Sequence, residues 1–545
     1  MSYTTLNFLL FVGVVTLVYF LFPVKKYQWT VLLAASYYFY LLTGYRYAVY
    51  ILLTTATTYG SALWMDSIAQ KGKQQLEAHK KEWDREQKKA FKAQIKKRKL
   101  AISTATLVLN FGILGFLKYY NFFAGSLNDL LGGLGFSFSA PTLHLILPLG
   151  ISFYTFQSMG YVLDVYQEKV PAERNFFKTA LFVSFFPQII QGPIGIYNQL
   201  AVQLYQPRKF DFTQFKYGCM LMLWGYFKKM VIADRALIPF NAVLDNYGDF
   251  GGTTLLFTVL LYALQLYMDF SGGIDITRGV AQLLGIHMSE NFRRPYFART
   301  INEYWRRWHI SLGGWMRDYV FYPVATSKLF LNISKQMKRS KFGATKFGGH
   351  VAKVLTTSFT SLIIFTLVGV WHGANWKYVG FGLWNGGIIM LSTILEPVFE
   401  SWTRMLKINT ENVFFRLFQM ARTFVVVLIG YVFDIAPGFL SALVTFKRIL
   451  FNQNLAEGLS QIRGLNLAAQ GFDKHDWCLL GICTVFILIV SVIQERNDGT
   501  TIRTMLDQKP FVVRLAVIVA GIMAVLVFGM YGPGFSAAEF VYMQF

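Results

Sequence analysis

Long apolar stretches separated by short polar connections run along most of the chain. Three of them, Leu9–Phe22, Leu355–Trp371 and Phe511–Met530, are nearly free of charged residues. A membrane-spanning helix needs about 20 apolar residues, because each residue adds about 1.5 Å along its axis. With their flanks these stretches reach that length, so the pattern predicts an all-α polytopic membrane protein.

Counting apolar stretches forward gives the expected membrane elements. They are Thr4–Phe22, Gln28–Leu42, Tyr47–Trp64, Ala101–Phe122, Leu145–Val165, Leu181–Ile196, Tyr217–Ile232, Leu255–Phe270, Leu355–Trp371, Val379–Leu395, Phe418–Phe433, Trp477–Val492 and Val512–Met530. Several are short for a full crossing, and short segments are typical of tilted or re-entrant helices. We therefore expect 11 to 13 membrane elements, some of them re-entrant.

Composition and charge narrow the class of protein further. Of the 545 residues 54% are hydrophobic and 15% are charged, which excludes a soluble, disordered or disulfide-scaffold protein. The net charge of +23 would suit nucleic acid, but the cations lie in short connections. Residues 71–99 hold 12 Lys/Arg against 4 acids, and residues 325–353 hold 7 Lys/Arg and no acid. This positive-inside pattern predicts that both connections are cytoplasmic and the N-terminus extracytoplasmic, with no nucleic-acid partner.

The basic connection Lys71–Lys99 has no proline and one glycine, with Glu77/Lys81 and Asp84/Lys88 spaced for helical ion pairs. We expect one solvated or interfacial helix near anionic lipid headgroups, or a docking site for a carrier protein. The three cysteines lie in apolar surroundings without metal-ligand spacing, so buried thiols and no metal site are expected.

One region is too polar for ordinary spans and too aromatic for a solvated loop. It runs from Asp269 to Tyr322. Charged or non-helical backbone at membrane depth is tolerated only where protein or a water-filled cavity surrounds it. We therefore expect re-entrant or interfacial helices that line a cavity, and we look for function here.

Two histidines are the candidate catalytic residues. His372 ends an apolar segment, beside Gly373, and an imidazole that exchanges a proton near neutral pH is a natural general base. A hydrogen-bonded interfacial histidine is the structural alternative. His309 lies four residues after Trp305, so a helix would place both on one face; a basic-aromatic interfacial helix explains this motif equally well.

Several polar residues in apolar segments are weaker candidates for supporting or tunnel-lining roles. Gln265 and Asp269 share a helix face before Ser271 and two glycines, which are expected to break the helix. Asp269 could orient a histidine, although a structural pair with Arg278 is favoured. Tyr154, Gln188 and Gln191 accompany Pro and Gly in apolar segments, a pattern typical of kinks around a polar tunnel or of close helix packing.

Five sequence blocks in order resemble the membrane-bound O-acyltransferase (MBOAT) family, in particular its bacterial alginate O-acetylation (AlgI-like) branch. They are LPLGISFYTFQSMGYVLDVY (147–166), FVSFFPQIIQGPI (182–194), LQLYMDFSGGID (264–275), ENFRRPYFARTINEYWRRWHISLGGWMRDYVFYPV (290–324) and GVWHGANW (369–376). The resemblance implies a ring of tilted helices around a central funnel. It assigns His372 to the family's catalytic histidine and His309 to its second motif position.

The resemblance also implies the activity. The branch passes an acyl group, usually acetyl, from a cytoplasmic thioester towards hydroxyls of an exported cell-surface polysaccharide. Acetyl-CoA or a carrier-protein thioester would be the donor substrate, with no bound cofactor. An extracytoplasmic (SGNH/AlgX/AlgJ-like) transferase or the glycan-export machinery would be the partner, at the bacterial cytoplasmic membrane. Trp371 and Asn375 are candidates for stabilising the oxyanion by proximity to His372.

This interpretation divides the chain into N-terminal transmembrane helices (1–70), a basic helix (71–100), a catalytic core (101–400) and C-terminal helices (401–545). Three alternatives stay open. The DltB-like branch would transfer D-alanine to teichoic acid from a carrier-protein thioester. A transporter or channel, or a scaffold for glycan export, would carry out no acyl chemistry.

Overall fold

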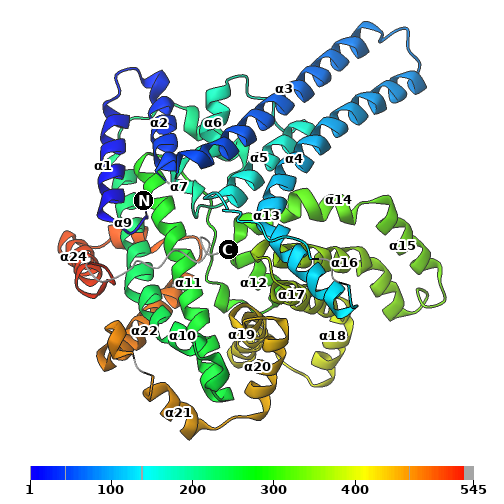
Figure 1. Ribbon diagram of the computed structural model, residues 1–545. Coiled ribbons are helices and arrows are strands. Elements are labelled where there is room, and N and C mark those ends of the chain that lie inside the picture. The colour runs from blue at the N-terminus through cyan, green and yellow to red at the C-terminus, as the bar shows by residue number, and fades with distance from the viewer. Residues whose placement is uncertain (1, 43, 137–138, 466, 533–545) are drawn as a thin grey trace. The chain divides into compact units, whose positions relative to one another are not determined.

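The computed structural model describes residues 2–42, 44–136, 139–465 and 467–532 (Figure 1). Its only β contact within these ranges is an isolated antiparallel bridge between Phe292 and Trp308. The chain divides into two compact units that are interleaved in sequence. Unit 1 comprises residues 1–222 and 274–289, and unit 2 comprises residues 223–273 and 290–545. The described part of the chain is thus an all-α fold, and unit 2 begins inside a helix, α9 (Phe212–Tyr226), that starts in unit 1.

Unit 1 is built from the N-terminal helices. They are α1 (Leu6–Leu21), α2 (Gln28–Leu41), α3 (Ala48–Ala78), α4 (Arg85–Gly133), α5 (Ile151–Tyr166), α6 (Phe176–Ser184), α7 (Phe186–Ile189), α8 (Tyr197–Tyr205) and most of α9 (Phe212–Tyr226), with short 3₁₀ turns η1 (Lys25–Tyr27) and η2 (Tyr45–Tyr47). Its core is aromatic: Phe8, Phe39 and Phe186 are buried together, and the Tyr3 hydroxyl donates to the Phe186 carbonyl.

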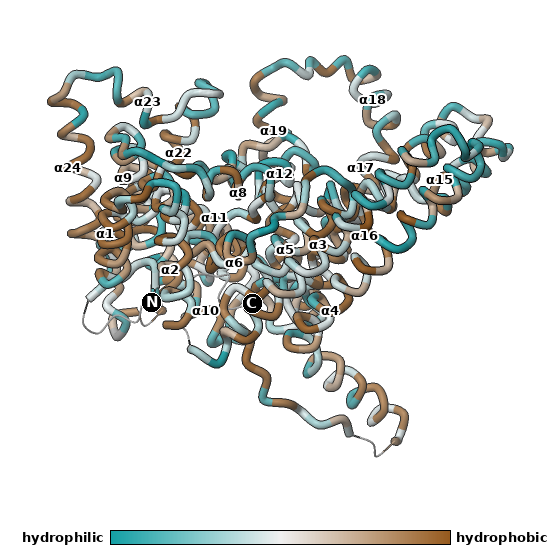
Figure 2. Tube along the Cα trace, turned by 90° about the horizontal axis from the view of Figure 1, so that it is seen from above, coloured by the Kyte–Doolittle hydropathy of each residue, from teal (hydrophilic) through white to brown (hydrophobic). Residues whose placement is uncertain are grey.

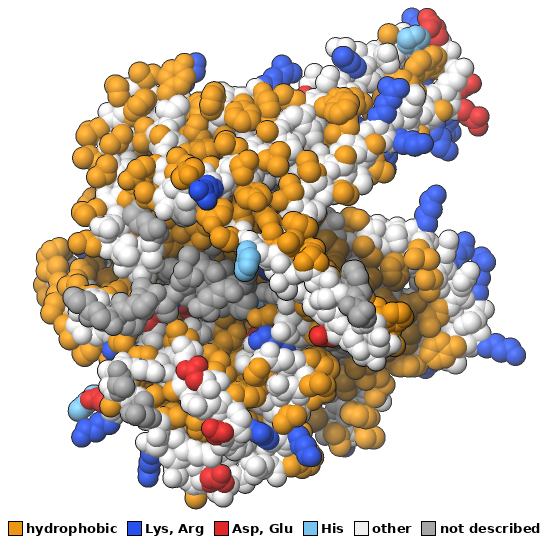
Figure 3. All heavy atoms as spheres, in the orientation of Figure 1, with side chains coloured by type: hydrophobic (Ala, Val, Ile, Leu, Met, Phe, Trp, Pro, Cys, Tyr) orange, Lys and Arg blue, Asp and Glu red, His pale blue; other side chains and the backbone are white. Residues whose placement is uncertain are grey.

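Helices α3 and α4 form a long antiparallel hairpin that projects from unit 1 in Figure 1. The connection predicted as one helix is therefore a helix–turn–helix. The physical reason is a capping box: the Asp84 carboxylate accepts the Gln87 amide, and the Gln87 side chain accepts the Asp84 amide, which starts α4 after the turn. Lys and Arg side chains gather at the hairpin tip in Figure 3.

Unit 2 contains the remaining helices. They are α10 (Asp234–Leu244), α11 (Gly252–Leu283, whose end belongs to unit 1), α12 (Ile301–Arg307), α13 (Ile310–Met316), α14 (Tyr322–Ala325), α15 (Lys328–Arg339), α16 (Lys346–His372), α17 (Trp376–Ile394), α18 (Glu396–Met405), α19 (Val413–Ile435), α20 (Phe439–Phe451), α21 (Leu455–Arg463), α22 (Lys474–Arg496), α23 (Ile502–Asp507) and α24 (Phe511–Phe528). Two π-helical segments, η3 (Phe227–Ala233) and η6 (Arg317–Phe321), and 3₁₀ turns η4 (Tyr247–Asp249), η5 (Pro295–Phe297) and η7 (Ala468–Gln470) complete it.

Six helices of the described chain are long and apolar enough to cross a membrane: α4, α11, α16, α19, α22 and α24. The bent pair α17 and α18 would make a seventh. Apolar residues colour most of α24 in Figure 2, and none of its apolar window is buried by protein, as expected of a lipid-facing helix. The chain is therefore a multi-pass membrane protein. The higher count of 11 to 13 elements included shorter and re-entrant segments, and it stays a prediction.

Small residues let helices of unit 2 approach one another closely. In the α16–α17 pair, a Cβ on Gly369 would lie 2.2 Å from the Tyr378 carbonyl oxygen, and a Cβ on Gly382 would lie 2.3 Å from the Phe365 carbonyl oxygen. The glycines at Gly369 and Gly382 therefore allow close helix packing. By contrast, the predicted break after Ser271 is wrong. Helix α11 continues through Gly272, which packs against the Gly225 carbonyl of α9.

Candidate functional site

The turn between α16 and α17 carries His372. This residue ends α16, and its half-buried imidazole packs 5.2 Å from the Phe381 ring and 6.4 Å from the Tyr378 ring, between centroids. Gly373 follows, and any Cβ there would come within 2.2 Å of the Tyr378 ring. A residue without a side chain is therefore required to let Tyr378 close over the turn. In the sequence, a glycine follows the histidine at the end of an apolar segment. In the structure, that glycine leaves room for the Tyr378 ring.

His309 occupies a break between two short helices. Helix α12 ends at Arg307, and α13 begins at Ile310. His309 itself has left-handed backbone angles, with φ of 46°, and only 3% of its surface is exposed. The prediction that Trp305 and His309 share one helix face is therefore wrong, because the helix stops between them.

The reason for the break is a small two-stranded contact. The Arg293 amide donates to the Arg307 carbonyl at 2.9 Å, and the Ile310 amide donates to the Asn291 carbonyl at 3.0 Å. These bonds flank the Phe292–Trp308 bridge and replace the helical bonds that would have continued α12. His309 therefore lies in the break between α12 and α13, directly after the extended Trp308, and not within a helix.

Trp371 connects the two histidines. Its ring centroid lies 5.9 Å from that of His309 and 5.5 Å from that of His372. Both imidazoles therefore pack against the same indole ring. The Phe270 ring also packs edge-on against His309, at 4.9 Å between ring centroids. Unit 2 thus gathers two imidazoles, which accept and donate protons, inside a largely aromatic wall.

Two other predicted residues lie around His372. The Trp305 indole nitrogen donates to the Asn385 side-chain oxygen at 3.3 Å, and its ring lies 6.2 Å from Phe381, which itself contacts His372. Asn375 caps α17, because its side-chain oxygen accepts the Lys377 amide at 3.0 Å. Trp305 therefore belongs to the aromatic wall, and the Asn375 oxygen serves the helix end.

Asp269 and Ser271 are engaged by two lysines of η3. Lys229 Nζ lies 2.5 Å from an Asp269 carboxylate oxygen and 2.8 Å from one of Asp234, and Lys228 Nζ donates to the Ser271 hydroxyl at 2.9 Å. Such pairing is expected, because burying an unpaired charge costs roughly several kcal/mol of desolvation free energy. The expected pair of Asp269 with Arg278 is wrong, because α11 is continuous and nine residues place the two on opposite faces, about 13.5 Å apart along the axis. Arg278 lies 3.6 Å from Asp275.

The remaining candidates lie in other buried positions. Gln265 is 2% exposed on α11 in unit 2. Tyr154, Gln188 and Gln191 are buried in unit 1, on α5 and around α7. The Gln188 amide donates to Gln157, while neither polar atom of the Gln191 amide has a protein partner within the part of the chain described. Gln157, Gln188 and Gln191 are thus buried amide side chains of unit 1, whereas both histidines belong to unit 2.

Several residues of the site were missed by sequence reasoning. Lys228 and Lys229 interrupt the apolar stretch of residues 217–232, and two adjacent cations in such a stretch were a usable signal. Asn291, whose side-chain oxygen accepts both the amide and the hydroxyl of Ser311, had no local signal. Neither had Glu495 on the distant helix α22. It contacts Arg294 and Arg307 in the two paired segments, residues 291–294 and 307–310, that we call the histidine loop.

Comparison with known proteins finds one family domain in the chain. Residues 171–338 match the family model of MBOAT, the membrane-bound O-acyltransferase family, and this range includes His309. The chain is 34% identical over 326 residues to a probable alginate O-acetylase of Pseudomonas syringae pv. tomato, covering 60% of this chain and 56% of that protein. It is 32% identical to a peptidoglycan O-acetyltransferase of Helicobacter pylori, covering 51% and 53%.

A more distant relative is the teichoic acid D-alanyltransferase of Bacillus subtilis, which is 27% identical and covers 54% of this chain and 71% of that protein. The chain therefore aligns with little more than half the length of the first two relatives. All three names describe the transfer of a small acyl group. Residues 171–338 of the chain thus match a domain of the membrane-bound O-acyltransferase family.

Proposed function

We propose that this protein is a membrane-embedded O-acyltransferase that moves an acetyl group from a cytoplasmic thioester towards hydroxyls of an exported cell-surface polysaccharide. The observation that carries the proposal is the meeting of His309 and His372 at Trp371 within a multi-pass membrane fold. The O-acetylating relatives, on alginate and on peptidoglycan, support acetyl as the group and a glycan as the acceptor.

The reaction needs one proton acceptor and a site for a developing negative charge. In our proposal His372 accepts the proton of the acceptor hydroxyl, and the oxygen attacks the thioester carbonyl. The carbon–sulfur bond breaks, an ester forms, and the proton from His372 passes to the departing thiol. N–H groups near the turn, with Trp371 as a candidate, would stabilise the tetrahedral oxyanion. His309 would orient the acceptor or share the proton.

The donor, the direction and the partners belong to the same proposal. Acetyl-CoA or an acetylated carrier protein would approach from the cytoplasm. An extracytoplasmic SGNH/AlgX/AlgJ-like transferase would receive the group where the glycan is modified, at the bacterial cytoplasmic membrane. The basic connections at residues 71–99 and 325–353 support a donor that carries phosphate groups.

The test uses purified protein in liposomes with labelled acetyl-CoA. We expect wild type to consume the thioester and His372→Ala to lose at least about 10²-fold in rate, the usual contribution of a general base. His309→Ala should also lose activity. His475→Ala is the matched control, because His475 is exposed on α22 and pairs with Asp473.

Two results would overturn the proposal. Equal rates in wild type and His372→Ala would remove the histidine from the chemistry. Consumption of neither acetyl-CoA nor an acetylated carrier protein, tested in the same liposomes, would favour a transporter or scaffold. Selective use of a D-alanyl carrier would instead assign the activity of the teichoic acid relatives.

A further inference from the structure

The loop that carries His309 is held in a conformation that it would not adopt by itself. Arg294 and His309 both have left-handed backbone angles, with φ of 47° and 46°. Residues with a Cβ rarely occupy this region, because the Cβ crowds the neighbouring carbonyl. Such strain persists only where surrounding contacts maintain it. The contacts that maintain this loop therefore decide where the imidazole lies.

Part of that support comes from the loop itself. Asn291 accepts the amide and the hydroxyl of Ser311, each at 2.9 Å, on the far side of His309. The backbone bonds between Arg293 and Arg307 and between Ile310 and Asn291 tie the two strands together. These bonds fix the strands relative to each other. They do not anchor the pair to the rest of unit 2.

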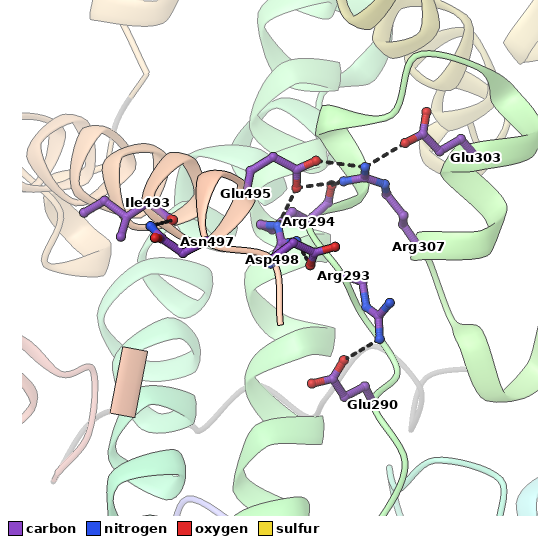
Figure 4. A network of polar contacts seen from close by, with 9 residues as sticks. All are labelled: Glu290, Arg293, Arg294, Glu303, Arg307, Ile493, Glu495, Asn497 and Asp498. Carbon is purple, nitrogen blue, oxygen red and sulfur yellow. Dashed lines mark hydrogen bonds and ion pairs between the residues drawn. The ribbon is translucent and has the colours of Figure 1, made fainter. Parts of the chain in front are cut away.

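One anchor is a carboxylate from another helix, shown in Figure 4. Glu495, next to the last residue of α22, accepts from Arg294 Nε at 2.5 Å and from both terminal nitrogens of Arg307 at 2.9 Å. The two arginines are the outer residues of the paired strands. One carboxylate therefore bridges both strands of the loop, with the paired geometry that makes arginine–carboxylate contacts strong.

The network is shielded enough to matter. The side chains of Arg294, Arg307 and Glu495 are 14%, 18% and 27% exposed. Glu303 and Asp498 contact its edges, at 2.6 Å from Arg307 and 3.1 Å from Arg294. Isolated ion pairs on an open surface contribute little, whereas a partly buried network with bidentate geometry resists displacement by water.

We propose that Glu495 is a positioning residue for His309. It contacts neither the imidazole nor the reacting atoms. By holding Arg294 and Arg307 together it keeps the histidine loop in its left-handed conformation and so presents the imidazole towards Trp371 and His372. This inference rests on the function proposed for His309, and it adds a helix outside the matched family domain to the catalytic apparatus.

The experiment compares wild type with Glu495→Gln and Glu495→Asp in the liposome assay. Glu495→Gln keeps the shape and removes the charge, so we expect kcat to fall about tenfold while KM for the thioester stays within twofold. Glu495→Asp keeps the charge and should retain more activity. The control is Glu411→Gln, which removes the exposed ion pair with Arg416.

A second readout reports on His309 directly. The rate of carbethoxylation of each histidine by diethyl pyrocarbonate, followed by mass spectrometry, measures imidazole accessibility independently of activity. We expect His309, buried in wild type, to react several-fold faster in Glu495→Gln, with His475 as the unchanged internal reference. Arg307→Lys provides a second variant, because lysine keeps the charge and loses the bidentate contact.

Each outcome is decisive. A fall in kcat together with faster modification of His309 supports the proposal. An unchanged kcat and an unchanged modification rate overturn the positioning role. Faster modification with full activity removes His309 from the reaction, and the positioning role falls with it, while a loss of activity in His372→Ala would still support acyl transfer. A fall in kcat without any change at His309 would assign Glu495 a different role.

Discussion

At the scale of single residues, the chemistry proposed for His372 depends on a neighbour that has no side chain. Gly373 lets the Tyr378 ring lie directly against the backbone of the turn. The same ring contacts the His372 imidazole. The absence of a side chain at Gly373 therefore affects the orientation of the His372 imidazole, through the Tyr378 ring. An added methyl group would act on the imidazole through the tyrosine.

We expect Gly373→Ala to lower acyl-transfer activity by about tenfold or more and to destabilise the fold by about 1–3 kcal/mol, the usual cost of forcing extra volume into a packed site. Activity in liposomes and thermal unfolding in detergent measure the two effects. Gly387→Ala is the control, because no atom lies within 4 Å of a Cβ at that helical position. Equal behaviour of the two variants would contradict the packing argument.

Residue identity could be predicted here better than residue environment. His372 and His309 stand out in the sequence because imidazoles are rare beside apolar segments. The left-handed backbone of His309 could not be predicted, since it results from pairing with Asn291–Arg294 and not from its own neighbours. For the same reason, nothing in the local sequence connects His309 with Glu495.

At the scale of elements, helix ends were harder to predict than helices. The apolar stretches correspond to helices such as α16, α22 and α24. Their ends depend on caps that a hydropathy pattern does not contain. Asp84 with Gln87 and Asp473 with Asp476 are capping boxes whose spacing is visible in the sequence once a turn is suspected. If the capping box at Asp84 is not considered, the pattern of residues 71–99 predicts a single helix.

The base of this hairpin contains a pH-sensitive contact. Glu168 lies 2.7 Å from Lys99 of α4 and 3.1 Å from Lys73 of α3. The hydrogen bond from Lys99, supported by Lys73, lowers the pKa of Glu168 below its ordinary value. A lowered folded-state pKa means that the stabilisation is complete above the ordinary glutamate range. It is lost as the pH falls through the folded value.

We therefore expect Glu168→Gln to lower the unfolding temperature at pH 7 and to have little effect at pH 3. The difference should be small, less than about 1 kcal/mol, because the Glu168 side chain is half exposed and the pair is screened. Thermal unfolding of both proteins across this pH range tests it. Glu77→Gln, an exposed change on α3, is the control, and a gap that persists at pH 3 would contradict the charge argument.

At the scale of the whole molecule, the division into two units follows no boundary in the sequence. Unit 1 takes back residues 274–289 after the chain has entered unit 2. Two of the three crossings fall inside α9 and α11, where composition does not change, and the third falls in the connection after α11. Hydropathy predicts spans one at a time, so it contains no information on which spans pack together. The predicted segment boundaries at residues 70, 100 and 400 remain predictions.

Membrane orientation is the prediction that belongs to this scale. In a variant lacking the three native cysteines, single cysteines at Lys80 and Lys341 should react with a membrane-impermeant maleimide only in inside-out vesicles. A cysteine at the exposed Tyr45, in the connection before α3, should react only from the opposite side. Labelling of all three from one side would contradict the positive-inside assignment. Intact α-helical content would show that the variants fold.

The bracing of the histidine loop by α22 has a consequence for the order of synthesis. His309 is made well before Glu495, which follows 186 positions later in the chain. At about 5–20 residues per second, the ribosome needs roughly 10–40 s to cover that distance. Through this interval, by the bracing proposed above, the nascent chain has its family domain but no anchored loop. The enzyme would thus stay inert towards thioesters until its late helices have entered the membrane.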